Sequence, residues 1–188
     1  TKEKPNLRRL KLRIVGGKYK SRVLSGFDGD KIRPTSDKTR ESLFNILQNR
    51  IYGAEFLDLF CGTGAMGIEA LSRGAKFVTF NDADRNSLNL LRKNLEKLKV
   101  SEDYEIKNYD ALIFLKNAGK KYDIIFIDPP YKTDLGERAI ASILNSLKDD
   151  GVAILESEIP FTGAIDGLKV VDERKYGRAR LTFFEKGE

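Results

Sequence analysis

Short apolar segments alternate with amphipathic ones along most of the chain, and this alternation limits the folds open to it. Amphipathic, helix-like patterns occupy 68–71, 87–98, 111–118 and 135–147. Strand-like runs precede, separate and follow them, at 56–60, 77–80, 104–107, 122–127 and 152–156. Such βα alternation predicts an α/β fold with a mostly parallel, doubly wound sheet. Two more runs, 169–172 and 180–185, have no helix between them and predict an antiparallel C-terminal hairpin, making seven strands.

The N-terminal part follows a different pattern. Apolar residues on both sides of Gly16-Gly17 predict a β-hairpin formed by 12–15 and 19–24. Thr35 or Ser36 can cap a following helix, whose apolar positions lie between 43 and 47. We therefore expect residues 1–50 to form a basic hairpin-and-helix extension packed on a body of residues 51–188.

Charge separates these two parts. Residues 1–40 hold 13 Lys/Arg and four Asp/Glu, a net charge of +9, whereas the other 148 residues hold 21 Lys/Arg and 24 Asp/Glu, a net charge of −3. A basic extension on a mildly acidic body is typical of a protein that binds a polyanion. A solvated tail without a partner is the alternative interpretation.

The composition excludes several kinds of catalytic, metal-binding and membrane-spanning feature. The chain has no histidine, so it lacks the commonest general base and the commonest metal ligand. Its single cysteine, Cys61, excludes an intramolecular disulfide and a cysteine zinc cluster. No apolar run approaches the roughly 18 residues of a membrane span. Any catalysis must therefore use carboxylates, hydroxyls or a bound cofactor.

Residues 62–67 read Gly-Thr-Gly-Ala-Met-Gly and lie between a predicted strand and a predicted helix. Glycines here let a ligand approach the backbone, and Asp82 at the end of the next strand can accept from a ribose hydroxyl. NAD and S-adenosylmethionine both fit this pattern, as does a turn that serves packing alone. Asp58 favours S-adenosylmethionine, because a carboxylate attracts an ammonium group and repels a pyrophosphate. Asp110, after the third strand, offers an acceptor to a purine amino group.

The tetrapeptide Asp128-Pro129-Pro130-Tyr131 directly follows the most apolar strand. An exocyclic amino nitrogen of a nucleobase is a poor nucleophile, because its lone pair is delocalised into the ring. Asp128 and the Pro129 carbonyl can hold both N–H groups and position the nitrogen for in-line attack on a sulfonium methyl. Tyr131 offers a stacking face to an unstacked base. The competing interpretation is an ordinary Pro-Pro turn with a capping aspartate.

With both motifs placed, the chain resembles the bacterial 16S ribosomal RNA guanine-N2 methyltransferase family (RsmD type), within the Asp-Pro-Pro-Tyr class of S-adenosylmethionine-dependent methyltransferases. The similarity covers nearly the whole chain. In place of the glutamate usual at the end of the family's second strand, this chain has Asp82. The matching stretches are 13–17, 33–45, 57–64, 67–72, Glu156-Ser157-Glu158 and Tyr176-Gly177.

The resemblance implies a Rossmann-like class I methyltransferase fold, S-adenosyl-L-methionine as cofactor and catalysis by Asp128, Pro129, Pro130 and Tyr131. It also implies 16S rRNA as partner, in the assembling or assembled small ribosomal subunit. We further expect a cytoplasmic monomer that uses no metal and no membrane. Cofactor contacts are expected at Asp58, Phe60, Gly62, Gly64, Asp82, Ala83, Asp110, Ala111 and Asp128. Contacts to RNA are expected at Arg13, Lys18, Lys20, Arg22, Arg33, Thr35 and Arg40.

Three other functions remain open at this point. An adenine-N6 methyltransferase acting on DNA or RNA would use the same tetrapeptide, although 188 residues leave little room for a DNA-reading region. A non-catalytic RNA-binding assembly factor would explain the charge but not the intact Asp128 and Asp82. An NAD-dependent oxidoreductase would explain the glycine turn, but the chain lacks a histidine to move the accompanying proton.

Overall fold

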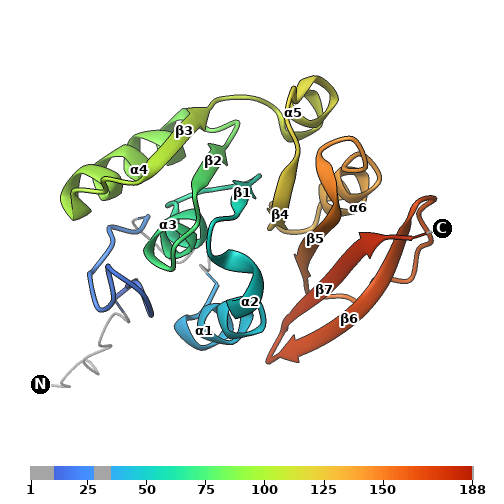
Figure 1. Cartoon of the computed structure of the whole chain (residues 1–188), viewed down its shortest axis with the longest axis horizontal. Coiled ribbons are helices and arrows are strands. Elements are labelled where there is room, and N and C mark those ends of the chain that lie inside the picture. Colours follow the sequence, from blue (N-terminus) through green and yellow to red (C-terminus); the bar gives the residue numbers. More distant parts are fainter. Residues whose placement is uncertain (1–10, 28–34, 188) are drawn as a thin grey trace, which may run out of the picture.

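The computed structural model describes residues 11–27 and 35–187. Within these residues, seven strands form one sheet in the order β3-β2-β1-β4-β5-β7-β6, which Figure 1 shows from left to right. Strands β1 to β5 run parallel to one another, and β7 is antiparallel to both β5 and β6. The strands are β1 (Glu55–Asp58), β2 (Phe77–Asn81), β3 (Asp103–Lys107), β4 (Tyr122–Ile127), β5 (Leu147–Ser157), β6 (Leu168–Tyr176) and β7 (Ala179–Lys186).

Helices cover both faces of the sheet. On one face, Leu43 of α1 packs in a core cluster with Phe56, Phe80 and Phe126 from the strands. On the other, α5 and α6 pack against Ile125 and its neighbours. The chain thus forms three layers, as the βα alternation predicts. The helices are α1 (Asp37–Ile46), α2 (Gln48–Ile51), α3 (Ala65–Ser72) and α4 (Arg85–Leu98) with the first cluster, and α5 (Ala111–Asn117) and α6 (Leu135–Ile140) with the second.

Strand β4 shows how the sequence sets these layers. Ile124 and Phe126 belong to the first core cluster, whereas Ile125 and Ile127 belong to the second. Successive side chains of a strand point to opposite faces, so a central strand covered on both sides needs a continuous apolar run. The same alternation places Asp128, the next residue after Ile127, on the face of Phe126.

The N-terminal hairpin is present but less regular than predicted. Arg13 and Val23 form a single bridge, flanked by a bond from the Ile14 N–H to the Arg22 carbonyl. Its tip bonds to helix α3 instead of extending the ladder: the Lys18 N–H donates to the Ser72 carbonyl at 2.8 Å. Ile14 is buried in the first core cluster, so this N-terminal segment shares its core with the sheet.

One helix is shorter than its apolar spacing predicts. The pattern 135–147 indicated a single helix, but α6 ends at Ile140 and β5 begins at Leu147. Between them, Ser146 closes a tight turn on the Ile143 carbonyl, while Leu147 pairs with Tyr122 across a bulge in the ladder. In the N-terminal extension, Ser36 caps α1 by accepting from the Thr39 N–H, as expected. Within the described ranges, no helix has the length and apolar character needed to cross a bilayer.

Candidate active site

The glycine-rich turn links β1 to α3, at the carboxyl edge of the sheet. Gly64 adopts a φ of 85°, and a Cβ there would lie 2.2 Å from Leu91 Cδ1. A Cβ on Gly67 would lie 2.2 Å from the Phe80 ring. Around Gly62, by contrast, the nearest atom to such a Cβ belongs to Phe27, at 4.0 Å. Two of the glycines therefore permit close packing, while the third leaves backbone open to a ligand.

Asp58 ends β1 directly beneath this turn. Its side chain is almost wholly buried, and its Oδ2 accepts a hydrogen bond from the Gly67 N–H at 3.0 Å. Burial raises the pKa of this carboxyl from 3.8 to about 7, and the nearby Asp82 carboxyl adds to the effect. A cation bound beside Asp58 would favour its ionised form.

Asp82 lies at the end of β2 and holds two loops by backbone hydrogen bonds. Its Oδ2 accepts from the Gly62 N–H and its Oδ1 from the Asp84 N–H, both at 2.9 Å. Partial burial raises its pKa. Each carboxylate oxygen can accept a second bond, so a ribose hydroxyl can still bind here.

Asp110 caps helix α5, a role that its sequence position did not reveal. Its Oδ1 accepts from the Leu112 N–H at 3.0 Å and the Ile113 N–H at 3.1 Å. Neighbouring Ala111 is buried in the second core cluster, so only its backbone can reach a ligand. Phe60 is half-buried against the same cluster, and the exposed Ala83 uses its carbonyl to accept from the Asn108 amide.

Asn81 was missed by the sequence interpretation. Its buried amide donates to the Leu59 carbonyl and to the Tyr109 carbonyl, each at 3.1 Å, and accepts from the Tyr109 N–H at 3.3 Å. These bonds join the ends of β1 and β3 across β2. The sequence feature that could have identified it is the polar Asn-Asp pair at the end of an apolar strand.

Asp128 follows β4 at the same edge of the sheet. Burial raises the pKa of its carboxyl well above the usual range, and the Glu156 and Asp58 carboxyls raise it further. After the two prolines, the Tyr131 side chain is 63% exposed, so its ring is available to a base. The Thr133 hydroxyl donates to the Pro130 carbonyl at 2.8 Å and shapes the chain beyond the motif.

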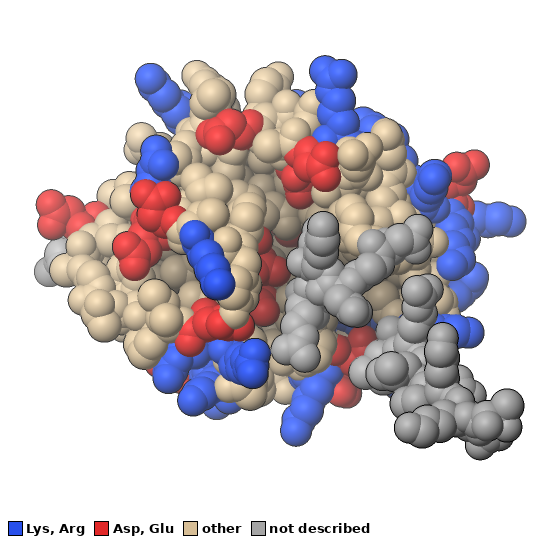
Figure 2. All heavy atoms as spheres, turned by 180° about the vertical axis from the view of Figure 1, so that it is seen from behind, with Lys and Arg blue, Asp and Glu red and all other residues tan. Residues whose placement is uncertain are grey.

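Glu156 stands beside Asp128 and is the second residue that the sequence interpretation did not place in the site. Strand register pairs Ile127 with Leu155, so the next residues, Asp128 and Glu156, occupy neighbouring positions and point to the same face. Glu156 Oε2 accepts from the Thr35 hydroxyl at 2.6 Å, and burial raises its pKa. Figure 2 shows acidic side chains in a hollow of one face of the molecule.

The expected RNA contacts are distributed unevenly. Arg13 and Lys18 are exposed but bind acids of the protein itself, Asp37 at 2.8 Å and Glu102 at 2.7 Å. Thr35 is nearly buried against Glu156. Lys20 and Arg22 are exposed, and neither has an ion pair within the described residues. Arg33 lies outside the described residues.

Arg40 requires a correction, because its guanidinium has no exposed surface and cannot reach RNA. It donates to the Arg13 carbonyl and to Asp37 Oδ1 at 2.9 Å, and its Nε lies 3.8 Å from Glu69 Oε2. The buried Glu69 carboxylate also accepts from the N–H groups of Val15 and Gly16, at 3.0 and 2.9 Å. This ion pair therefore fixes the N-terminal hairpin to helix α3.

Comparison with known proteins identifies the family of the chain. The family model described as conserved hypothetical protein 95 matches residues 12–185. The chain belongs to this family. Ribosomal RNA small subunit methyltransferase D of Haemophilus influenzae is 41% identical to it over 152 residues, which cover 78% of this chain and 79% of that protein. This similarity shows that the chain is a methyltransferase.

Solved structures show the same fold. The protein yhhF of Escherichia coli, provisionally described as a methyltransferase, is 32% identical and superposes with a TM-score of 0.82, covering 95% of this chain and 99% of that one. SMU.776, also provisionally described as a methyltransferase and solved in complex with SAH, shares the fold with a TM-score of 0.63. It is 20% identical, and the match covers 77% of this chain and 48% of that one.

Proposed function

We propose that this protein transfers the methyl group of S-adenosylmethionine to the N2 amino group of a guanine in 16S rRNA, within the assembling or assembled small ribosomal subunit. The name of the Haemophilus influenzae relative supports the small-subunit rRNA as substrate. The choice of guanine rests on one observation in the site, the neighbouring carboxylates of Asp128 and Glu156 at the ends of β4 and β5.

The site fits a cationic methyl donor. Asp58 and Asp128 are carboxylates whose burial raises their pKa, and the negative charges of Asp58 and Glu156 act on Asp128. An ammonium or sulfonium group beside them would relieve this repulsion. The open backbone at Gly62 and the carboxylate of Asp82 complete a place for the nucleoside part.

S-adenosylmethionine supplies an activated methyl group, so the protein must only position the nucleophile. Asp128 and the Pro129 carbonyl hold the two N–H bonds of the amino group and direct its lone pair at the methyl carbon. The carbon–nitrogen bond forms as the carbon–sulfur bond breaks, and the nitrogen then loses one proton. Because burial raises its pKa, Asp128 is well suited to receive that proton.

Glu156 distinguishes guanine from adenine when it is ionised, the form that the hydrogen bond from Thr35 favours against the effect of burial on its pKa. In guanine, the ring N1–H lies beside the N2 amino group and can donate to an ionised carboxylate. In adenine, the ring N1 beside the N6 amino group is an acceptor, whose lone pair would face the Glu156 oxygens and be repelled. An unpaired polar contact of this kind commonly costs a large factor in selectivity. We therefore assign base recognition to Glu156 and the reacting amino group to Asp128.

Methyl transfer to purified small subunits from a strain lacking the gene tests this assignment. The wild-type protein should produce N2-methylguanosine, and Glu156→Gln should reduce the guanine rate at least tenfold while S-adenosylmethionine affinity stays unchanged. The matched control is Glu158→Gln, an exposed acid two residues further along the chain. Formation of N6-methyladenosine by the wild-type protein would overturn the proposed function. A Glu156→Gln rate equal to that of Glu158→Gln would overturn only the role of Glu156.

A further inference from the structure

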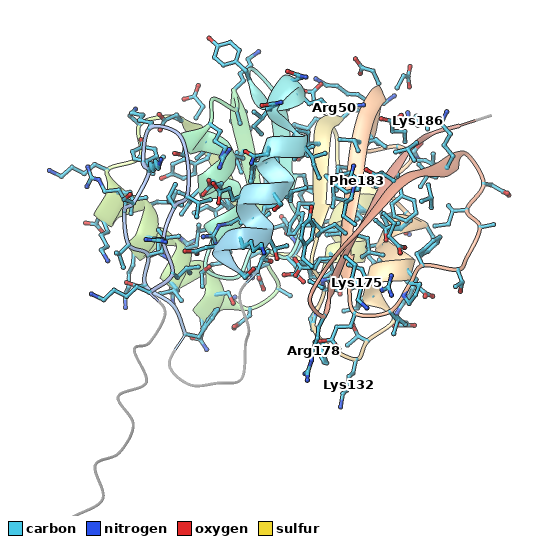
Figure 3. The ribbon with its side chains drawn as sticks, turned by 90° about the horizontal axis from the view of Figure 1, so that it is seen from below. Arg50, Lys132, Lys175, Arg178, Phe183 and Lys186 are labelled. Carbon is cyan, nitrogen blue, oxygen red and sulfur yellow. The ribbon has the colours of Figure 1, made fainter. Side chains whose placement is uncertain are left out.

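A second group of basic residues lies at the catalytic edge, outside the N-terminal extension. Lys132 follows the Asp-Pro-Pro-Tyr turn, Lys175 lies near the end of β6, and Arg178 lies in the turn between β6 and β7. All three side chains are exposed. Figure 3 shows Arg178 and Lys132 at the same end of the molecule, with Lys175 next to them along the hairpin.

Strand register brings this turn to the active site. Arg180 of β7 pairs with Ser157 of β5, immediately beyond Glu156. Because β7 is antiparallel to β5, the residues preceding Arg180 extend past the carboxyl edge of the sheet, where Asp128 follows β4. Tyr176 is partly buried against the first core cluster and anchors the turn there. The β6–β7 turn thus lies at the same edge of the sheet as Asp128 and Glu156.

Lys132, Lys175 and Arg178 have no acidic partner within the described residues, unlike two arginines of the same hairpin. Arg174 binds Asp172 at 2.9 Å and Arg180 binds Glu173 at 2.8 Å, so both belong to ion pairs on the hairpin itself. Across residues 11–27 and 35–187, no ion pair involves Lys132, Lys175 or Arg178. In the N-terminal hairpin, Arg13 and Lys18 are neutralised by Asp37 and Glu102, whereas Lys20 and Arg22 have no ion pair within the described residues.

The chain around Lys132 is also held in an uncommon conformation. Lys132 has a φ of 56°, which is rare for a residue other than glycine, and the adjacent Thr133–Pro130 hydrogen bond at 2.8 Å supports this turn. Such conformations are frequent where a side chain must be presented in a particular direction. Here the side chain is one residue from the exposed ring of Tyr131, which we assign to base stacking.

We propose that Lys132, Lys175 and Arg178 form a phosphate clamp that binds the RNA backbone next to the target guanine. This inference rests on the proposed rRNA substrate. A base held between Asp128 and Tyr131 brings the phosphates on either side of it to the surrounding edge, and three unpaired cations are placed to receive them. Contacts to phosphate position the RNA, while Glu156 and Asp128 read the base.

The salt dependence of RNA binding tests the clamp without any methyl transfer. The variant Lys132→Gln/Lys175→Gln/Arg178→Gln is compared with Lys76→Gln/Lys121→Gln/Lys169→Gln, which removes the same charge from exposed residues near the opposite edge of the sheet. Binding to protein-free small-subunit rRNA is measured across a potassium chloride series. Each lost phosphate contact should flatten the slope of log affinity against log salt by about 0.7–0.9, or about two units for the clamp variant.

Methyl transfer to small subunits provides the second measurement. The clamp variant should raise the KM for subunits at least tenfold with little change in kcat, and its S-adenosylmethionine affinity and melting temperature should match the control. Equal salt slopes for the clamp and control variants would overturn the clamp, as would a wild-type protein that does not bind the rRNA. A wild-type protein that binds rRNA but does not methylate small subunits would overturn the proposed function, while the salt slope would still decide the clamp.

Discussion

The Arg40 Nε lies 3.8 Å from Glu69 Oε2, and neither side chain has any exposed surface. This pair joins the helix that follows the N-terminal hairpin to the helix that follows the glycine turn. Around it, Glu69 also binds Arg73 at 2.9 Å and the backbone of Val15 and Gly16. The buried Glu69 carboxylate therefore fastens the N-terminal hairpin to the helix that follows the glycine turn, together with the bonds between the hairpin and Ser72.

Removing one partner of this pair should destabilise the whole protein. Arg40→Ala leaves Glu69 charged and buried with less compensation, and such losses cost about 3–5 kcal/mol of the free energy of unfolding. Urea denaturation at neutral pH measures the change. Arg50→Ala is the matched control, since it breaks the exposed pair with Glu185 and should cost at most about 1 kcal/mol. Equal losses for the two variants would refute the structural role of Arg40.

The pKa of Asp58 makes stability depend on pH in a defined direction. Its carboxyl titrates at 3.8 when unfolded and at about 7 when folded, so the folded state favours the protonated form. This contribution to stability is complete below about pH 4 and is lost as the pH rises to about 7. Asp58→Asn should therefore be more stable than wild type at pH 8 and indistinguishable at pH 4, as measured by denaturation without cofactor. A constant difference across this range would contradict the assigned pKa.

The same substitution should weaken cofactor binding at pH 8, because the neutral amide cannot attract an ammonium group. Calorimetric titration with S-adenosylmethionine measures the loss. A variant that is more stable yet binds less well would show that the buried carboxylate is kept for binding at the expense of stability.

Asp82 should act on cofactor affinity more than on the reaction itself. Asp82→Ala removes the acceptor proposed for the ribose and also the acceptor of the Gly62 and Asp84 N–H groups. We expect binding of S-adenosylmethionine to weaken by about 1–3 kcal/mol, with the rate largely restored at saturating cofactor. Asp103→Ala serves for comparison, because this exposed carboxylate begins β3 at the opposite edge of the sheet. Unchanged affinity in Asp82→Ala would exclude this placement.

Asp128 should show the opposite behaviour. Asp128→Ala removes an acceptor for the reacting amino group, and the loss of one well-placed polar group at a reacting centre commonly lowers turnover by a hundredfold or more. Cofactor affinity should fall far less than turnover. Single-turnover kinetics and a binding titration separate the two effects, and parallel losses in both would show that Asp128 serves cofactor capture instead.

The mostly parallel sheet, its antiparallel C-terminal hairpin and the edge that carries the site followed largely from the sequence, because periodicity and strand-end acids are local signals. The apolar run of β4, the glycine turn and the Asp-Pro-Pro-Tyr turn are all placed as predicted. The sequence did not predict where α6 ends. Ile143 and Leu147 continue the helical spacing of apolar residues, although this region forms a turn and the start of a strand. In this segment, strand pairing with Tyr122 outweighs the local pattern.

The roles of individual charges were less predictable, because a charge count does not show which side chains are buried. Arg40 stands at the spacing i, i+3, i+4 and i+7 with Leu43, Phe44 and Leu47, so it lies on the apolar face of α1. That spacing was a signal against an RNA contact. Glu156 required the strand register as well, since only pairing of Ile127 with Leu155 places it beside Asp128.

The nucleosides of small-subunit rRNA provide the most direct test of the proposed reaction. The rRNA is purified from cells lacking the gene and from the same cells carrying the wild-type gene or Asp128→Asn, then digested and quantified by mass spectrometry. We predict that one N2-methylguanosine per small subunit is lost on deletion, restored by the wild-type gene and not restored by Asp128→Asn. Unchanged N2-methylguanosine in the deletion strain, or loss of N6-methyladenosine in its place, would contradict the assignment of this protein as a guanine-N2 methyltransferase.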